Sequence, residues 1–254
     1  ILTAVIIPCI GVVVVLRRLS IMGDALSHVS LAGVAAGLVF GINPVLSAVI
    51  FAVAASLGVE KIRSAISRFG EISTAVIMSV GIGLAGILSG FVTSANFNSF
   101  LFGSLVAISP FEKYLVMVLS IVVLAVFLLL YRALFYITFD EESARLAGIP
   151  VRLVTIVFTV LTAVTISISS RVVGTLVVSS MMVLPVAVSL QLAKSYKQTV
   201  VFSVLSSVFF VVTGLFLSYY LNLKPGGTIV LTGVASLAVT LLVKSSAGRL
   251  KRRA

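Results

Sequence analysis

Charged side chains are scarce in this chain of 254 residues. Asp, Glu, Lys and Arg make up 10% of it, 60% of the residues are hydrophobic, and the mean hydropathy is +1.30. An average soluble domain carries roughly 25% charged residues, so this composition excludes a soluble globular protein. Most of its uncharged stretches reach the roughly 17 to 25 residues that span a bilayer as a helix. The sequence therefore predicts one polytopic transmembrane domain over residues 1–254, with no room for a sizeable soluble catalytic domain.

Cysteine and histidine occur once each, as Cys9 and His28. A single cysteine excludes an internal disulfide, and we interpret Cys9 as a small buried hydrophobe because it stands in an apolar segment. One histidine and no H-E-x-x-H sequence argue against an intramembrane metalloenzyme, since zinc hydrolases typically carry three protein ligands and an open water position. The motif G-x-x-x-x-G-K-[ST] is also missing, so the chain does not bind ATP through a P-loop.

Residues 81–86 read G-I-G-L-A-G, which formally matches a dinucleotide-binding motif. That motif requires a preceding strand and an acidic residue about 20 positions later, and neither occurs here. Small residues spaced four apart, such as Gly33 with Gly37 and Gly86 with Gly90, instead favour close helix packing in lipid.

The apolar segments predict an all-α bundle of about nine membrane spans. They lie near residues 1–16, 21–41, 44–59, 72–92, 114–133, 153–170, 172–192, 198–220 and 228–243. A turn at residues 41–44 separates the second span from the third, because Pro44 cannot continue a helix and disfavours helical conformation in the residue before it. Residues 93–111 are too polar at their start to cross and too apolar to be fully solvated, so we interpret them as an interfacial or re-entrant segment.

The basic residues are distributed unevenly over the two sides of these spans. Threading puts Lys113, Arg171 and Lys224 on one side and the rest of the 18 Lys and Arg residues on the other. Because cytoplasmic loops carry the excess of Lys and Arg, the second side is predicted to be cytoplasmic, with the N-terminus outside and the C-terminus inside. This clustering between spans also argues against nucleic acid as the reason for the net charge of +11. The chain begins inside an apolar run without Met, so we expect its first span to be incomplete.

Asp24 is the only acidic residue predicted inside the membrane, and His28 follows four residues later. On a helix this spacing puts both side chains on one face, with Cβ atoms about 5 to 6 Å apart. Counted from Arg17 and Arg18 at the cytoplasmic surface, His28 lies about 15 Å along the helix, near the middle of a hydrocarbon core about 30 Å thick. A charge at that depth costs at least ~2.5 to 3.5 kcal/mol, so the two residues need a polar cavity or a partner.

Two interpretations of the Asp24–His28 pair stay open. A structural hydrogen bond between the two side chains would satisfy both groups. Alternatively they are metal ligands, since carboxylate oxygen and imidazole nitrogen both bind Zn²⁺ or Mn²⁺, and a two-fold homodimer would bring two copies of each to its axis. Small residues near the pair would allow close helix approach: Gly23, Ala25, Ser27, Ser30 and Gly33.

Residues 139–150 are the longest predicted cytoplasmic connection. Asp140 is the predicted N-cap of a short helix whose first turn is acidic, Gly148 its C-terminal cap and Pro150 its end. The helix is either a plain loop element or a docking element for a partner. As a docking element it would use Asp140, Glu141, Glu142, Ser143, Ala144, Arg145, Leu146, Ala147 and Gly148.

These segments together resemble the membrane permease subunit of the metal-ion ABC importers, the zinc and manganese permease family. Residues 16–28, LRRLSIMGDALSH, are similar to that family's LRR-x-S-x-x-GD-x-LSH opening, and residues 139–150 are similar to its cytoplasmic coupling helix. Shorter matches in the same order are Leu101-Phe102-Gly103, Val173-Gly174 with Leu184-Pro185, and Pro225-Gly226-Gly227. The resemblance covers nearly the whole chain.

The resemblance implies a homodimeric pore whose path is lined by Asp24 and His28, with ATP-binding subunits on the cytoplasmic face and an extracytoplasmic metal-binding protein. We therefore expect ATP-driven import of Zn²⁺ or Mn²⁺ by alternating access across a bacterial plasma (inner) membrane, with Fe²⁺ also open. We expect no tightly bound cofactor and no catalytic residues in this chain. The alternative is a proton-coupled secondary carrier with Asp24 and His28 as a relay.

Overall fold

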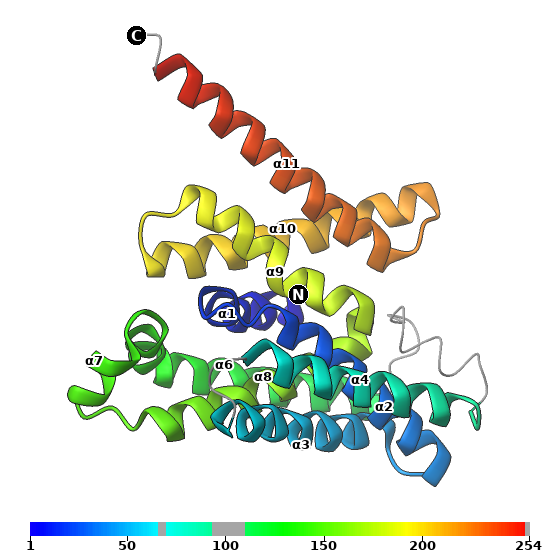
Figure 1. Cartoon of the computed structure of the whole chain (residues 1–254). Coiled ribbons are helices and arrows are strands. Elements are labelled where there is room, and N and C mark those ends of the chain that lie inside the picture. Colours follow the sequence, from blue (N-terminus) through cyan, green and yellow to red (C-terminus); the bar gives the residue numbers. More distant parts are fainter. Residues whose placement is uncertain (66–69, 93–109, 252–254) are drawn as a thin grey trace.

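The computed structural model describes residues 1–65, 70–92 and 110–251, and every regular element within these ranges is an α-helix (Figure 1). The all-α fold predicted from the sequence is thereby confirmed. The helices are α1 (Leu2–Leu16), α2 (Ile21–Phe40), α3 (Pro44–Ala65), α4 (Gly70–Ser89), α6 (Pro110–Phe139), α7 (Glu141–Leu146), α8 (Val151–Val173), α9 (Thr175–Leu192), α10 (Tyr196–Leu221) and α11 (Pro225–Lys251).

Within the described ranges, seven helices are long and apolar enough to cross a membrane: α2, α3, α4, α6, α8, α10 and α11. Helices α1 and α9 are apolar but shorter. The nine predicted spans correspond to these nine helices, although α6 and α11 extend beyond the predicted bounds at 133 and 243. The segment 93–111, interpreted as interfacial, falls outside the described residues up to position 109.

One predicted boundary is displaced. The sequence places a break at Arg171, but Arg171 lies in the last turn of α8 with 7% of its surface exposed. The chain breaks instead at Gly174, where φ is +97° and a side chain would be strained. A lone Arg between apolar residues therefore does not mark a loop here. Arg171 remains in α8, and the surrounding protein buries its side chain.

Helix α1 is enclosed by the other helices, between α9 and α10 on one side and α6 and α8 on the other (Figure 1). Ile7 and Ile10 are fully buried, in one apolar cluster with Phe127 of α6, Phe158 of α8 and Met182 of α9. A helix that is apolar all round belongs in the interior of a bundle. The prediction for the lone cysteine is confirmed, because Cys9 is 5% exposed in this cluster.

Helix α2 packs closely on α3 through two glycines. A Cβ atom on Gly33 would lie 2.8 Å from Cα of Ala48, and one on Gly37 would lie 2.8 Å from Cα of Pro44. Larger residues would push the helices apart, so the predicted packing role is confirmed for Gly33 and Gly37.

The same role is wrong for Gly86 of α4 and for Gly90, which follows the end of α4, within the described part of the chain. A Cβ atom on Gly86 would meet nothing within 4 Å, and one on Gly90 only the carbonyl of Ile87 in the preceding last turn of α4, at 3.4 Å. It is Gly81 that brings α4 onto α2, because a Cβ there would lie 2.9 Å from the backbone nitrogen of Val29.

Candidate functional site

A tight turn between α1 and α2 positions Asp24. The backbone N–H of Arg18 donates to Val15 O at 3.0 Å and that of Leu19 donates to Val14 O at 2.8 Å, the pattern that closes a helix with one residue in the left-handed conformation. Arg18 is that residue, with φ +58°. The turn is short, so α2 begins at once and Asp24 falls in its first turn.

Asp24 and His28 form the half-buried face of a helix that is otherwise enclosed at this level. Both side chains are partly exposed, whereas the residues between and beside them are buried: Gly23, Ala25, Leu26, Ser27 and Val29. The hydroxyl of Ser27 donates to the Gly23 carbonyl at 2.8 Å, so it is satisfied within the helix. The two residues are therefore the polar groups of this stretch that are accessible to a ligand.

The pair faces away from α3. Nine residues separate Asp24 from Gly33 and His28 from Gly37, which is about two and a half turns at 3.6 residues per turn. The glycines contact α3, so the two polar side chains project from the opposite side of α2. One side of this helix is specialised for packing and the other carries the ionisable groups.

Within the part of the chain that the structure describes, the side chains of Asp24 and His28 make neither a hydrogen bond nor an ion pair. The structural Asp–His hydrogen bond considered above is thus not formed. The described residues also contain no group of three or more His, Cys, Asp or Glu side chains able to hold a metal ion. One described chain therefore offers two ligands at this position and leaves any others to be supplied from elsewhere.

Sequence reasoning missed a series of buried hydroxyl groups on α8. Thr159, Thr162 and Thr165 each donate to the carbonyl four residues earlier, at 2.7 to 2.8 Å. Further along, Ser170 Oγ lies 3.4 Å from Ser30 Oγ of α2, and Ser167 Oγ donates to Ala48 O of α3 at 3.4 Å. The Thr and Ser residues recurring at helical spacing over 155–170 were the available signal. The threonine hydroxyls are satisfied within α8, whereas Ser170 and Ser167 connect α8 to α2 and α3.

The predicted short helix after residue 139 is present as α7, and its predicted caps are confirmed. Both the hydroxyl and the backbone N–H of Ser143 donate to the Asp140 carboxylate, at 2.5 and 3.0 Å. These hydrogen bonds hold the pKa of Asp140 below its ordinary value, so the cap is lost only as the pH falls through that lowered pKa. At the other end, Gly148 adopts φ +78° and Ile149 N–H donates to Ala144 O at 3.1 Å.

Helix α7 has an inner and an outer side. Ala144 is fully buried, whereas Glu142, Ser143 and Ala147 are exposed and Leu146 is 86% exposed. The helix therefore rests on the bundle through Ala144, and its exposed side carries Glu142, Ser143, Leu146 and Ala147.

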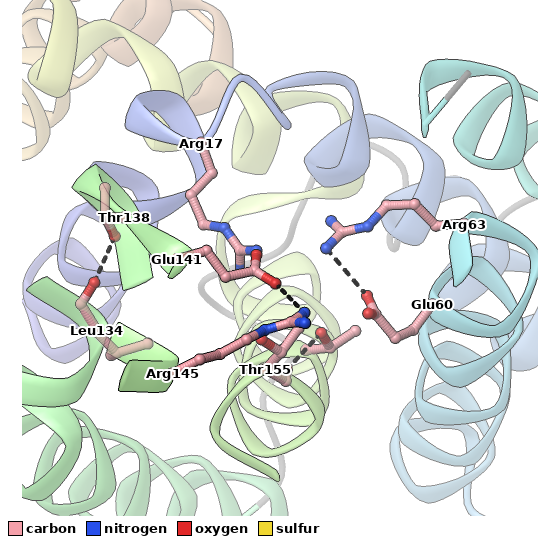
Figure 2. Close-up of polar contacts among 9 residues, drawn as sticks. Arg17, Glu60, Arg63, Leu134, Thr138, Glu141, Arg145 and Thr155 are labelled. Atoms are coloured by element: carbon pink, nitrogen blue, oxygen red, sulfur yellow. Dashed lines mark hydrogen bonds and ion pairs between the residues drawn. The ribbon is translucent and has the colours of Figure 1, made fainter. Parts of the chain in front are cut away.

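Five charged residues gather beside α7, in what we call the α7 charge cluster: Arg17, Glu60, Arg63, Glu141 and Arg145 (Figure 2). Glu141 lies 2.7 Å from Arg145 and 3.6 Å from Arg17, and Glu60 lies 3.6 Å from Arg63. Burial lowers the pKa of Arg17 and the nearby Arg63 lowers it further, while Glu141 and Glu60 oppose the shift.

A cavity of about 1180 Å³ opens next to the cluster, between the end of α3, α7 and the start of α8. Its charged lining residues are Glu60, Lys61, Arg63, Glu141, Arg145 and Arg152. Residues far apart in the sequence thus meet at one end of the bundle. Lys113 and Arg171, predicted on the other side, stand at the opposite ends of α6 and α8.

Comparison with known proteins gives consistent matches over almost the whole chain. The family model described as the ABC 3 transport family matches residues 1–244. The "Probable metal transport system membrane protein" of Treponema pallidum (strain Nichols) is 35% identical over 243 residues, covering 95% of this chain and 90% of that protein.

Two further relatives carry the name of a metal. The manganese import system permease protein ScaB of Streptococcus parasanguinis is 28% identical, with 92% of this chain and 84% of that protein covered. The high-affinity zinc uptake system membrane protein ZnuB of Haemophilus influenzae is 26% identical, with 91% and 90% covered. Among solved structures, PsaBC from Streptococcus pneumoniae in complex with Fab matches with a TM-score of 0.84 and 26% identity, over 94% of this chain and 87% of that one.

Proposed function

Since the chain belongs to the ABC 3 transport family, we propose that it is the membrane-spanning subunit of an ATP-driven importer whose cargo is a divalent transition metal ion. The names of the manganese and zinc relatives support Mn²⁺ or Zn²⁺ as that cargo. The chain is a transport subunit and not an enzyme, so ATP is hydrolysed by a separate partner subunit.

The observation that carries the proposal is the isolation of Asp24 and His28 on the half-buried face of α2. Ionisable groups inside a membrane are costly unless they meet a partner or a polar cavity, and no partner lies within the described part of the chain. A passing metal ion supplies one, because it accepts both a carboxylate oxygen and an imidazole nitrogen.

The two ligands of one chain suit a homodimer. Two-fold symmetry is the commonest arrangement of oligomers, and it would bring two Asp24 and two His28 side chains to one axis. Two carboxylates would balance the charge of a divalent ion. The packing of α2 on α3 through Gly33 and Gly37 supports this arrangement, because it leaves the Asp24–His28 side of α2 turned away from α3.

Transport needs a site that binds well enough to strip water from the ion and weakly enough to release it. A small set of mixed oxygen and nitrogen ligands meets this requirement better than a closed thiolate cage. In the proposed cycle of alternating access, an extracytoplasmic metal-binding protein delivers the ion and it pauses at the Asp24–His28 pair. It leaves to the cytoplasm when the ATPase subunits change state.

We assign α7 to docking of the ATPase, and its outward side supports this role because Glu142 and Leu146 are exposed. The basic residues at the same end of the bundle support a cytoplasmic location for this face, with the C-terminus on the same side. The protein would then be a multi-pass component of a bacterial plasma membrane.

The test is metal uptake into proteoliposomes that contain this chain together with its ATPase subunit. We expect Asp24→Asn and His28→Ala to abolish ATP-dependent uptake of Zn²⁺ and Mn²⁺, because each removes a ligand, while the ATPase still copurifies. Ser27→Ala is the matched control. It lies on the same stretch of α2, and its hydroxyl contacts only the Gly23 carbonyl.

Uptake that persists in both ligand variants would show that the metal passes elsewhere. Uptake that survives ATP depletion and collapses with a protonophore would replace the ATP-driven importer by a proton-coupled carrier. Titration of the wild type with each ion identifies the preferred cargo.

A further inference from the structure

Glu141 of α7 forms an ion pair with Arg17, which follows the first helix of the chain. In the chain, α7 directly follows α6 and is connected to α8 by residues 147–150. Ala144 is its one buried residue. The ion pair with Arg17 is its polar link to α1 and lies 3.6 Å across. The Arg17 side chain is only 10% exposed, so it is held in place by its surroundings.

The two ion pairs of Glu141 differ in strength. Arg145 is 68% exposed and sits one turn away on the same helix, and such surface pairs contribute little. Arg17 is nearly buried, and removing one partner of a buried pair is costly because the other charge is left uncompensated. When α7 moves, Arg145 moves with it because both partners of that pair lie on α7. The ion pair to Arg17 therefore links the movement to a residue outside α7.

Arg17 is in turn part of the structure that starts α2. It is the C-cap of α1, and its backbone N–H donates to Val13 O at 2.9 Å. The N-cap of α2, Ser20, makes no side-chain cap hydrogen bond. The start of α2 is thus positioned by the turn that holds Arg17, and Asp24 lies in the first turn of that helix.

The other acid of the α7 charge cluster is engaged elsewhere. Glu60 on α3 pairs with Arg63 at 3.6 Å on the far side of the cluster, as Figure 2 shows.

We propose that the Arg17–Glu141 ion pair transmits the movement of α7 to the start of α2, and so to Asp24 and His28. The inference rests on the proposed function, in which α7 meets the ATPase and the Asp24–His28 pair meets the metal. Arg17 is then a positioning residue, which touches neither the nucleotide nor the ion.

The experiment measures metal uptake and ATP hydrolysis in the same proteoliposomes, with Mn²⁺ and Zn²⁺ as probes, and compares their ratio. The variants are Arg17→Gln, Glu141→Gln and the double variant. Arg132→Gln is the matched control, because it neutralises an exposed arginine of α6 that lies outside α7 and outside the α7 charge cluster.

We expect Arg17→Gln and Glu141→Gln each to lower the uptake per ATP hydrolysed by at least about fivefold, the lower end of ordinary coupling between two sites. ATP hydrolysis itself stays near the wild-type rate, since Glu142 and Leu146, the exposed residues on which the docking assignment is based, are unchanged. The double variant is no worse than either single one, because both remove the same contact. Arg132→Gln keeps the wild-type ratio.

An unchanged ratio in Glu141→Gln would overturn the proposal, and this variant remains informative if Arg17→Gln does not fold, since the Glu141 side chain is 42% exposed. Uptake and hydrolysis that fall by one common factor would also overturn it, because that result indicates lost docking. So would losses that multiply in the double variant. A wild-type complex without ATP-dependent uptake would instead overturn the proposed function, and the transmission role with it.

Discussion

Two glycines of α4 that stand two residues apart have opposite surroundings. A Cβ atom on Gly81 would lie 2.7 Å from Cγ2 and 2.9 Å from the backbone nitrogen of Val29. A Cβ atom on Gly83 would meet nothing within 4 Å in the described part of the chain. Val29 directly follows His28, so the contact at Gly81 sets how closely α4 approaches the stretch of α2 that carries Asp24 and His28, the proposed metal ligands.

Replacing these two glycines by alanine should therefore give opposite results. We expect Gly81→Ala to lower the free energy of unfolding by about 1–3 kcal/mol, the usual cost of adding a methyl group to a packed contact. Gly83→Ala should leave it unchanged or raise it by up to about 1 kcal/mol, because alanine is the better helix former. The measurement is the thermal unfolding midpoint of the protein in detergent. Equal midpoints for the two variants would contradict the close contact of α4 with α2.

The pattern of residues on a helix predicts such contacts only in part. Gly33 with Gly37 and Gly86 with Gly90 have the same spacing, yet only the first two face another helix in the described part of the chain. The spacing shows that close approach is possible, whereas the partner depends on the arrangement of all the helices.

At the level of single elements, α7 was the most predictable part of the site, because its signals are local. The acid at Asp140 and the glycine at Gly148 define its ends through contacts within a few residues. The ion pair between Glu141 and Arg17 had no such signal, since the two residues belong to distant parts of the chain. The Asp24–His28 spacing could be found for the same local reason, while the side of α2 from which the pair projects required the contacts of Gly33 and Gly37.

The exposed acid of α7 offers a test of docking that leaves the fold intact. Glu142 is exposed and no described residue pairs with it, so Glu142→Lys changes the surface charge and not an internal contact. We expect this variant to lose ATPase subunits during copurification or to hydrolyse ATP without importing metal.

The control for Glu142→Lys is Glu71→Lys, the same charge reversal at an exposed position in the first turn of α4. It should assemble and transport as the wild type does. Normal assembly and transport in Glu142→Lys would exclude a docking role for this face of α7.

For the whole molecule, hydropathy and charge predicted the architecture well because both act over long segments. Apolar length identified the helices that can cross a membrane, and the excess of Lys and Arg identified one end of the bundle. The displaced boundary at Arg171 marks the limit of that reasoning, since burial of one guanidinium depends on neighbours that hydropathy does not contain.

The lone buried cysteine allows the orientation to be measured directly. Cys9 is 5% exposed, so the wild type should react little with an impermeant maleimide. We expect Lys113→Cys to be labelled on intact cells and Arg152→Cys only after permeabilisation, because these residues stand at opposite ends of the bundle. Labelling of Arg152→Cys on intact cells would reverse the predicted orientation.

The enclosure of α1 has a consequence for biosynthesis. Helices α9 and α10 contact α1 and cover much of its surface, but the ribosome makes them long after it. In that interval the apolar surface that will meet Met182 must be sheltered by lipid or by the insertion machinery. Chains that stall before Thr175 would leave this surface open, and they would be natural substrates for membrane quality-control proteases. The environment of α1 is therefore complete only once α9 and α10 have been inserted.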